Sequence, residues 1–145
     1  MIRALIDTNV LASGIVGYRK GQGAPFEVIR RWRANSYELL TSLHVLDELS
    51  STLANPWFSQ YLSETERLAV LKLVRTAGTV VEPSPDLVQG VATHWEDDLV
   101  LAAAITGNAH YLVTGDRKLR ALRSLAGIRI VSVHEFLEVL EEAEE

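Results

Sequence analysis

Residues 99–113 read LVLAAAITGNAHYLV, and this stretch decides the fold class together with the segments that follow it. Its alanine-filled first part, Leu99–Ile105, predicts a helix, and its short apolar end, His110–Val113, predicts a strand. A basic helix is predicted over Arg117–Leu125 and a further strand over Ile128–Val131. Strands that alternate with helices are typical of βαβ units and a parallel sheet.

The N-terminal half repeats this alternation of strands and helices. Short apolar runs predict strands over Ile2–Ile6, Tyr37–Thr41 and Thr79–Val81. Helices are expected over Ala24–Ala34, where Pro25 stands in the first turn, and over Leu43–Leu53, where leucines share one face. The whole pattern predicts a three-layer α/β/α sandwich with a central parallel β-sheet, built as a single domain by residues 1–145.

Three segments have the sequence of a capping box, in which a serine or threonine precedes a glutamate by three positions. They are Ser63–Glu66, Thr93–Glu96 and Ser132–Glu135. Each predicts the start of a helix. The helix after Ser63 is expected to turn Leu68, Leu71 and Val74 inward and to stop near Gly78, and the last helix to turn Phe136, Leu137 and Leu140 inward.

The composition is that of a water-soluble globular protein, with 48% hydrophobic and 23% charged residues in 145. The absence of cysteine excludes disulfides, thiolate zinc sites and thiol nucleophiles. The net charge is −5, and part of it lies in the tail 141–145, which we interpret as a solvated, frayed helix end. No membrane-spanning run or signal-peptide pattern is present, so we expect no membrane association and a cytoplasmic location.

Acidic residues gather where the predicted strands end. Asp7 follows the first strand and Asp116 follows the strand at 110–113, while Glu48 lies in the helix after the second strand. The alanine-rich helix begins with the acids at 96–98. In a parallel sheet these positions share the edge where ligands bind. Carboxylates held together repel unless a cation neutralises them, and oxygen ligands suit magnesium or manganese.

Each acid also has a structural explanation. Asp7 and Asp116 stand where helix N-caps are expected. Asp97 and Asp98 would complement the dipole of a first helical turn, and Glu48 could lie on the surface. From spacing alone the metal site and the structural roles therefore both stay open.

Four motifs in order resemble those of the PIN-domain family, and the resemblance covers nearly the whole chain. The motifs are Leu5–Val10 (LIDTNV), Ser42–Leu49, Asp98–Ala104 and Tyr111–Leu119, the last with a Gly-Asp pair. The segment between Asn55 and Pro85 matches no motif. The resemblance implies a PIN-like α/β fold and a divalent-metal-dependent endoribonuclease that hydrolyses RNA phosphodiester bonds without a covalent protein intermediate.

The resemblance also assigns residue roles. It implies that Asp7, Glu48, Asp98 and Asp116 hold Mg2+ or Mn2+ and are the catalytic acids. Asn9 and Ser42 are expected to orient the ligands or phosphate oxygens, and Asp97 to lie beside the ligand Asp98 without binding the metal itself. Basic residues are candidates for contacts to RNA phosphates: Arg19 and Lys20 in a glycine-rich loop after the first motif, and Arg117, Lys118 and Arg120 after the fourth. A solvated basic helix face is the alternative for this last group.

Family context implies a VapC-like toxin of a type II toxin–antitoxin pair, with a small antitoxin as partner and a homodimer as the assembly. The alternative is a catalytically inactive PIN domain that serves as an RNA-binding or assembly module. Two other protein classes also have acids at strand ends, but this sequence lacks a residue that each requires. A haloacid-dehalogenase-type phosphatase needs a second acid where Asn9 stands, and a response-regulator receiver needs a lysine after a late strand.

Overall fold

The structure is a computed structural model that describes residues 1–83 and 95–144, with side chains from residue 97 onward in the second part. Six strands form one sheet in the order β3-β2-β1-β4-β6-β5. The first five in this order are parallel to one another, and β5 at the edge runs antiparallel to β6. The predicted α/β fold with a central parallel sheet is therefore confirmed, with one antiparallel strand added.

The strands are short, and helices separate all but the last two. The strands are β1 (Arg3–Ile6), β2 (Glu38–Ser42), β3 (Thr79–Val81), β4 (Tyr111–Val113), β5 (Ser124–Leu125) and β6 (Ile128–Val131). The helices are α1 (Thr8–Lys20), α2 (Ala24–Arg33), α3 (Leu43–Ala54), α4 (Pro56–Ser59), α5 (Glu64–Ala77), α6 (Trp95–Thr106), α7 (Arg117–Ala121) and α8 (Val133–Glu144).

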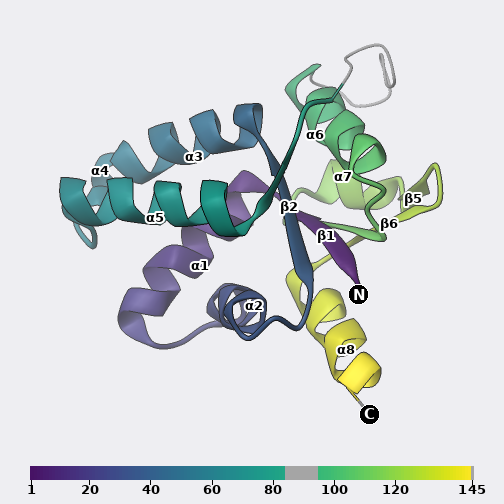
Figure 1. Cartoon of the computed structure of the whole chain (residues 1–145), viewed down its shortest axis with the longest axis horizontal. Helices are drawn as coiled ribbons and strands as arrows, with labels where there is room; N and C mark the ends of the chain where they lie inside the picture. Colours follow the sequence, from purple (N-terminus) through teal and green to yellow (C-terminus); the bar gives the residue numbers. More distant parts are fainter. Residues whose placement is uncertain (84–94, 145) are drawn as a thin grey trace.

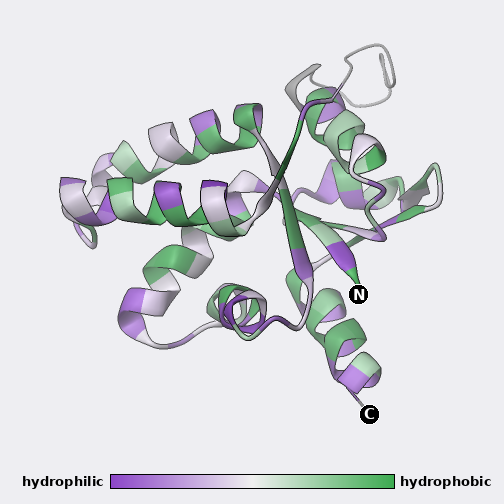
Figure 2. Cartoon of the chain, viewed as in Figure 1, coloured by the Kyte–Doolittle hydropathy of each residue, from purple (hydrophilic) through white to green (hydrophobic). Residues whose placement is uncertain are grey.

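Helices cover both faces of the sheet. In Figure 1, α1, α2, α3 and α5 lie on one side of the strands, and α6 and α7 lie on the other. The inner strands are apolar along most of their length, as Figure 2 shows, because a parallel sheet covered on both faces buries both sets of side chains. Leu5, Leu40 and Leu112, from three neighbouring strands, are all essentially inaccessible to solvent.

A helix, α1, occupies the segment that the glycines led us to expect as a loop. Its glycines allow α2 to approach closely, since a Cβ added at Gly14 would lie 2.6 Å from the Ile29 side chain and 2.6 Å from the Pro25 carbonyl oxygen. The chain turns only at Gly21, which caps the helix in the left-handed conformation with φ 71°. The glycines inside this segment serve helix packing, so the predicted glycine-rich loop is wrong.

Two of the three predicted capping boxes are confirmed by reciprocal hydrogen bonds. Ser63 and Glu66 exchange them at the start of α5, and Ser132 and Glu135 do so at the start of α8. The third involves Thr93 and the side chain of Glu96, which lie outside the described part of the chain. Helix α5 ends before Gly78 as expected, but Leu68 is 56% exposed, so the inward face predicted for this helix is only partly correct.

The basic helix predicted over 117–125 is shorter than expected. Helix α7 ends at Ala121, and Arg123 takes a positive φ of 62°. Ala126 and Gly127 also have positive φ, as a tight hairpin turn requires, and they join β5 to β6. The leucines and arginines of 117–125 predicted one helix, but the last residues of this segment belong to the β5–β6 hairpin.

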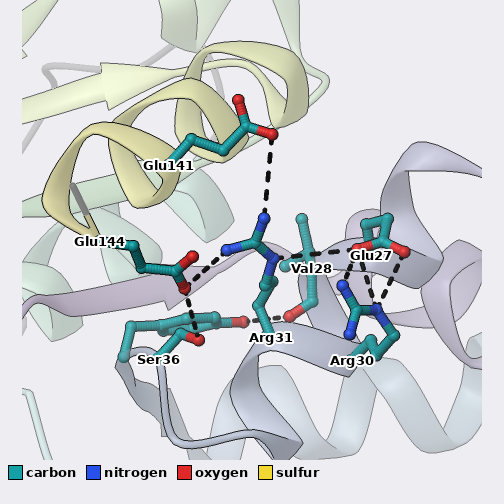
Figure 3. Close-up of polar contacts among 8 residues, drawn as sticks. Glu27, Val28, Arg30, Arg31, Ser36, Glu141 and Glu144 are labelled. Atoms are coloured by element: carbon teal, nitrogen blue, oxygen red, sulfur yellow. Dashed lines mark hydrogen bonds and ion pairs between the residues drawn. The ribbon is translucent and has the colours of Figure 1, made fainter.

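The acidic tail is an ordered helix end. Figure 3 shows Arg31 of α2 between carboxylates of α2 and α8. Its guanidinium lies 2.7 Å from Glu144 and 3.9 Å from Glu141, and Ser36 donates a hydrogen bond to Glu144. Residues 141–144 are exposed, as expected of a solvated helix end, but they stay helical to Glu144, so the expectation that this end is frayed is wrong. None of the described helices is long and apolar enough to cross a bilayer.

Candidate metal-dependent active site

The sheet order reverses between β1 and β4. From β1 the chain proceeds outward through β2 and β3, and it then returns through α6 to place β4 on the other side of β1. Crossovers on either side of such a point lie on opposite faces, which opens a crevice beyond the carboxyl ends of the two strands. Asp7 directly follows β1, and Asp116 follows β4 by three residues. The two aspartates are thus placed at the switch point of the sheet.

A buried threonine connects the two aspartates. The hydroxyl of Thr114 donates to Oδ2 of Asp7 at 2.7 Å and accepts from the backbone N–H of Asp116 at 3.0 Å. Thr114 is fully buried. Because its hydroxyl accepts from an amide, its proton is directed to Asp7, and the backbone of Asp116 is fixed beside that carboxylate.

Both aspartates are also helix N-caps, as the structural explanation of the sequence expected. Asp7 Oδ1 accepts from the N–H of Thr8 at 2.8 Å. Asp116 Oδ1 accepts from the N–H groups of Lys118 and Leu119 at 2.8 and 3.2 Å. Capping holds each carboxylate at the amino end of a helix, where the helix dipole favours negative charge. A cap uses only some of the acceptor sites of a carboxylate, so capping and metal binding are compatible.

Asp98 lies in the first turn of α6, which packs against β1, β2, β4 and α3. Helix α6 leads into β4, so its amino end faces the carboxyl ends of the strands. Asp98 is only 8% exposed. Burial of a carboxylate is costly unless a partner or a cation compensates its charge. The neighbouring Asp97 is half-buried.

Glu48 lies on α3, one turn after His44, and the two side chains form an ion pair when the histidine is protonated. Both side chains are partly exposed. Ser42, the last residue of β2, is buried and caps α3 by accepting from the N–H of Val45. Helix α3 therefore starts at the same sheet edge as α1, and Glu48 stands in its second turn.

The remaining predicted residues are distributed over a wider area. Asn9 is exposed at the start of α1. Arg19 and Lys20 lie in the last turn of that helix, roughly 18 Å along the axis from its first residue. Arg19 pairs with Glu66 at 3.0 Å.

The ammonium group of Lys20 lies over an aromatic pair in the region that matched no motif. It is 4.3 Å from the ring centre of Tyr61 and 5.8 Å from that of Trp57. Trp57 is largely exposed. Lys20 is therefore held at the far end of α1 from Asp7.

The basic residues after Asp116 lie nearer to the acids. Arg117 and Lys118 are exposed on the first turn of α7, and Arg120 is half-buried. The structure thus connects Asp7 with Asp116 and places Asp98 and Glu48 on helices that begin at the same edge. Within residues 1–83 and 97–144, no three His, Asp or Glu side chains already form a group that could hold a metal ion.

Comparison with known proteins identifies the family. A family model of the PIN domain matches residues 3–118. The chain belongs to the PIN-domain family. The matched segment contains Asp7, Glu48, Asp98 and Asp116, so the four acids predicted from the motifs lie within the PIN domain. None of the functionally curated proteins matches the chain by sequence.

Solved structures with the same fold include VapC proteins. VapBC2 from Rickettsia felis, solved with a DNA fragment from their promoter, has TM-score 0.60 and 16% identity over 90% of this chain and 98% of that one. PAE2754 from Pyrobaculum aerophilum has TM-score 0.60 and 22% identity over 97% of this chain and 96% of that one. VapC20 from Mycobacterium tuberculosis, a sarcin-ricin loop cleaving toxin, has TM-score 0.57 and 18% identity over 87% of this chain and 98% of that one. At these low sequence identities the comparison shows that the fold is shared.

Two residues of the site had no role in the sequence-based prediction. Thr114 is part of the fourth motif, and a threonine two residues before a strand-end aspartate is the pattern that could have shown it. His44 precedes Glu48 by four positions, the spacing that makes side chains neighbours on a helix.

Proposed function

We propose that this PIN domain is a divalent-metal-dependent endoribonuclease in which Asp7, Glu48, Asp98 and Asp116 hold Mg2+ or Mn2+. The observation that carries the proposal is the hydrogen-bonded connection from Asp7 through Thr114 to Asp116 at the switch point of the sheet. It fixes the carboxylate of Asp7 beside the backbone of Asp116, at the edge where α/β sheets bind ligands. Like charges in such a place are costly unless a cation lies between them.

The donor set fits a hard divalent cation. All four proposed ligands are carboxylates, which suit magnesium and manganese, whereas zinc sites are richer in histidine or cysteine. The hydroxyl of Thr8, next to Asp7, is buried and has no hydrogen-bond partner among the described residues, so a further oxygen is available at this place. Binding requires the side chains of Asp98 and Glu48 to turn toward Asp7, because no three acids of the described part are yet grouped.

A bound cation of this kind polarises a phosphate and lowers the pKa of a coordinated water. The residues of the chain prepare the site for that chemistry. Thr114 directs its proton to Oδ2 of Asp7 and so orients the carboxylate. Ser42 fixes the start of the helix that carries Glu48, and the half-buried Asp97 supports the turn of Asp98. Arg117 and Lys118, exposed beside Asp116, supply positive charge for the RNA backbone.

A cleavage assay tests the proposal. Purified protein should cut single-stranded RNA with magnesium or manganese, stop in chelator, and lose activity in Asp7→Asn and Glu48→Gln. Asp47→Asn is the matched control, since Asp47 is the exposed neighbour of Glu48 and its loss changes the net charge equally. An active Glu48→Gln variant, or equal loss in Asp47→Asn, would contradict the assignment of Glu48.

Metal binding is measured separately by thermal unfolding. A ligand that binds only the folded state adds about 2.7 kcal/mol at 100 times its Kd, so manganese should raise the Tm above its value in chelator. Identical melts and no heat of binding would refute the metal site. Binding of RNA without cleavage, under saturating manganese, would instead indicate the inactive RNA-binding or assembly module.

We further propose that the protein acts in the cytoplasm as the toxin of a type II pair, as a homodimer silenced by a small antitoxin. The similar fold of VapBC2 and VapC20 supports this role. Expression alone should slow growth of the host, and co-expression of the adjacent gene product should restore it. Normal growth with abundant active protein would contradict the toxin role and leave the nuclease proposal intact.

A further inference from the structure

A groove beside α7 collects three arginines on an otherwise acidic protein. It lies between α7, the β5–β6 hairpin and the first turn of α8. The residues that line it are Arg120, Arg123, Ser124, Arg129, Ile130, Val131 and Glu135. Three arginines and one glutamate line it, so the groove has a net positive charge although the whole chain has net charge −5. We call this set of residues the arginine groove.

The positive charge of the arginine groove is offset only in part, by Glu135, within the described part of the chain. No carboxylate there lies within ion-pair distance of Arg120, Arg123 or Arg129. The Nε of Arg120 is buried and has no hydrogen-bond partner in that part of the chain. The guanidinium group of Arg129 lies over the ring of Tyr111, 5.8 Å from its centre. Buried donors without partners are costly, so the groove is prepared for an acceptor.

The one carboxylate in the groove is engaged elsewhere. Glu135 Oε1 accepts from the N–H of Ser132 at 2.9 Å as part of the capping box of α8. Hydrogen bonds from Ser132, with smaller contributions from Arg120 and Arg129, hold the pKa of Glu135 below its usual range. Glu135 is therefore ionised at neutral pH, and its negative charge weakens the binding of an anion without filling the place of one.

Arg123 lies in the turn between α7 and β5 and has a left-handed backbone conformation. Its φ is 62°, the left-handed region in which glycine or asparagine is usual. Its carbonyl accepts from the N–H of Ile130 at 2.9 Å, a contact that any residue could make. This turn places Arg123 among the residues that line the groove.

The arginine groove lies close to the acidic site along the same helix. The N–H of Arg120 donates to the carbonyl of Asp116 at 3.0 Å, so the two residues are one helical turn apart, about 6 Å along the axis. A ligand with several linked phosphates could reach from one site to the other, whereas an isolated phosphate could not. Guanidinium groups bind phosphate oxygens in paired hydrogen bonds.

We propose that the arginine groove binds the phosphodiester backbone of single-stranded RNA next to the bond that is cut. The proposal rests on the proposed nuclease function for the placement of that bond. Arg120, Arg123 and Arg129 are positioning residues, and they hold the strand through its phosphates without reading its bases. Glu135 limits the affinity, which keeps release of the strand fast.

The test measures binding of short fluorescein-labelled RNA by anisotropy in chelator, over a series of salt concentrations. For single strands the slope of log affinity against log salt is about −0.7 per phosphate contact. In the Arg123→Gln, Arg129→Gln double variant the negative slope should be shallower by about 1.4, because two phosphate contacts are lost. If binding at ~1 M salt is unchanged, the variant should bind RNA about 25-fold more weakly than the parent at ~0.1 M salt. The Lys72→Gln, Arg75→Gln double variant, on the exposed face of α5, removes equal charge and should keep the slope.

A second variant gives an effect in the opposite direction. Glutamine at position 135 keeps the capping box and removes the negative charge, so Glu135→Gln should bind RNA more tightly than the parent with unchanged circular dichroism. A merely structural role for Glu135 would not tighten binding. In cleavage assays the Arg123→Gln, Arg129→Gln double variant should have a raised KM and Glu135→Gln a lowered KM, each with kcat nearly unchanged.

The outcomes separate the groove from the nuclease. If the parent cleaves RNA while the groove variant has the salt slope of the control, the groove assignment is overturned and the nuclease stands. If the parent fails to cleave but the slope changes as stated, the groove stands without the nuclease. Unchanged RNA binding with loss of binding to a labelled polyglutamate peptide would overturn the assignment to RNA in favour of an acidic protein. Competition by inorganic phosphate as effective as by RNA would overturn the linked-phosphate requirement.

Discussion

Replacement of Thr114 by valine tests the connection on which the candidate site depends. Valine has nearly the same shape but neither donates to Asp7 nor accepts from the N–H of Asp116, at distances of 2.7 and 3.0 Å in the parent. A hydrogen bond to a charged group contributes about 1.5–3 kcal/mol, and a neutral one about 1 kcal/mol. We therefore expect Thr114→Val to lower the free energy of unfolding by about 2–4 kcal/mol.

Serine at the same position is the matched control. Thr114→Ser keeps the hydroxyl and loses one buried methyl group, at a cost of about 1 kcal/mol. For a chain of this size about 1 kcal/mol corresponds to roughly 2–4 °C in Tm, so the valine variant should melt about 5–15 °C below the parent, and the serine variant a few degrees below. Urea unfolding followed by circular dichroism gives the free energies.

Activity provides the second readout of this comparison. Under the proposed function the valine variant should cleave RNA poorly even at temperatures where it is folded, because the carboxylate of Asp7 is no longer oriented. Equal stability of the valine and serine variants within ~0.5 kcal/mol, the scatter expected of surface substitutions, would refute the role given to the hydroxyl. Equal activity would refute its role in the site.

Three further outcomes are expected. Gly14→Ala should lower the free energy of unfolding by about 1–3 kcal/mol, because its Cβ would lie 2.6 Å from atoms of α2. The control Gly115→Ala, with nothing within 4 Å of the added Cβ, should unfold like the parent. A Gly14→Ala variant as stable as the parent would contradict the packing of α1 against α2. Asp116→Asn keeps a helix cap and removes a charge, so it should lose cleavage while melting in chelator at or above the parent; normal cleavage would return Asp116 to a purely capping role. The pKa of Glu66 lies below its usual 4.5 because Ser63 hydrogen-bonds to it, so its charged form adds stability above that pH that is lost as the pH falls through the lowered pKa. Unfolding of the parent and of Glu66→Gln should therefore differ at neutral pH and converge in acid, and a constant difference would count against the charge.

The strands and most helices were predictable because their signals are local. Apolar runs that end in aspartate and capping boxes such as Ser63 with Glu66 act within a few residues, so sequence alone is sufficient. Helix α1 was missed because glycines usually interrupt helices. The reason Gly14 is tolerated, the close approach of α2, depends on tertiary structure.

The hairpin after α7 was missed for a related reason. The leucines and arginines between 117 and 125 favour a helix, but β6 offers Arg123 and its neighbours an edge to pair with. Pairing with an edge strand is a long-range effect that overrides local preference. The exposure of Leu68 is also a long-range effect, because which face of α5 is buried depends on its contacts with α3 and β3.

The candidate site was predictable as a set of acids but not as an arrangement. Position at strand ends indicated Asp7 and Asp116 as candidates, and the resemblance to the PIN-domain motifs was needed to assign the set of four acids. The hydroxyl that connects them, from Thr114, and the pairing of His44 with Glu48 depend on side-chain geometry that motifs do not encode. The arginine groove brings together residues of α7, β6 and α8, and only the fold shows that Arg129 belongs with Arg120.

The central position of β1 has a consequence for the order in which the protein can fold during synthesis. Strand β2 follows β1 early, but β4, its other neighbour, comes much later, and the hydrogen bond between Asp7 and Thr114 spans 107 positions. While the ribosome makes the intervening residues, one edge of an apolar strand has no partner, and such edges promote association between chains. The nascent chain therefore acquires both its protected sheet and the hydrogen bonds of Thr114 to Asp7 and Asp116 in the same late step. A prematurely released fragment would be aggregation-prone and would lack the completed site.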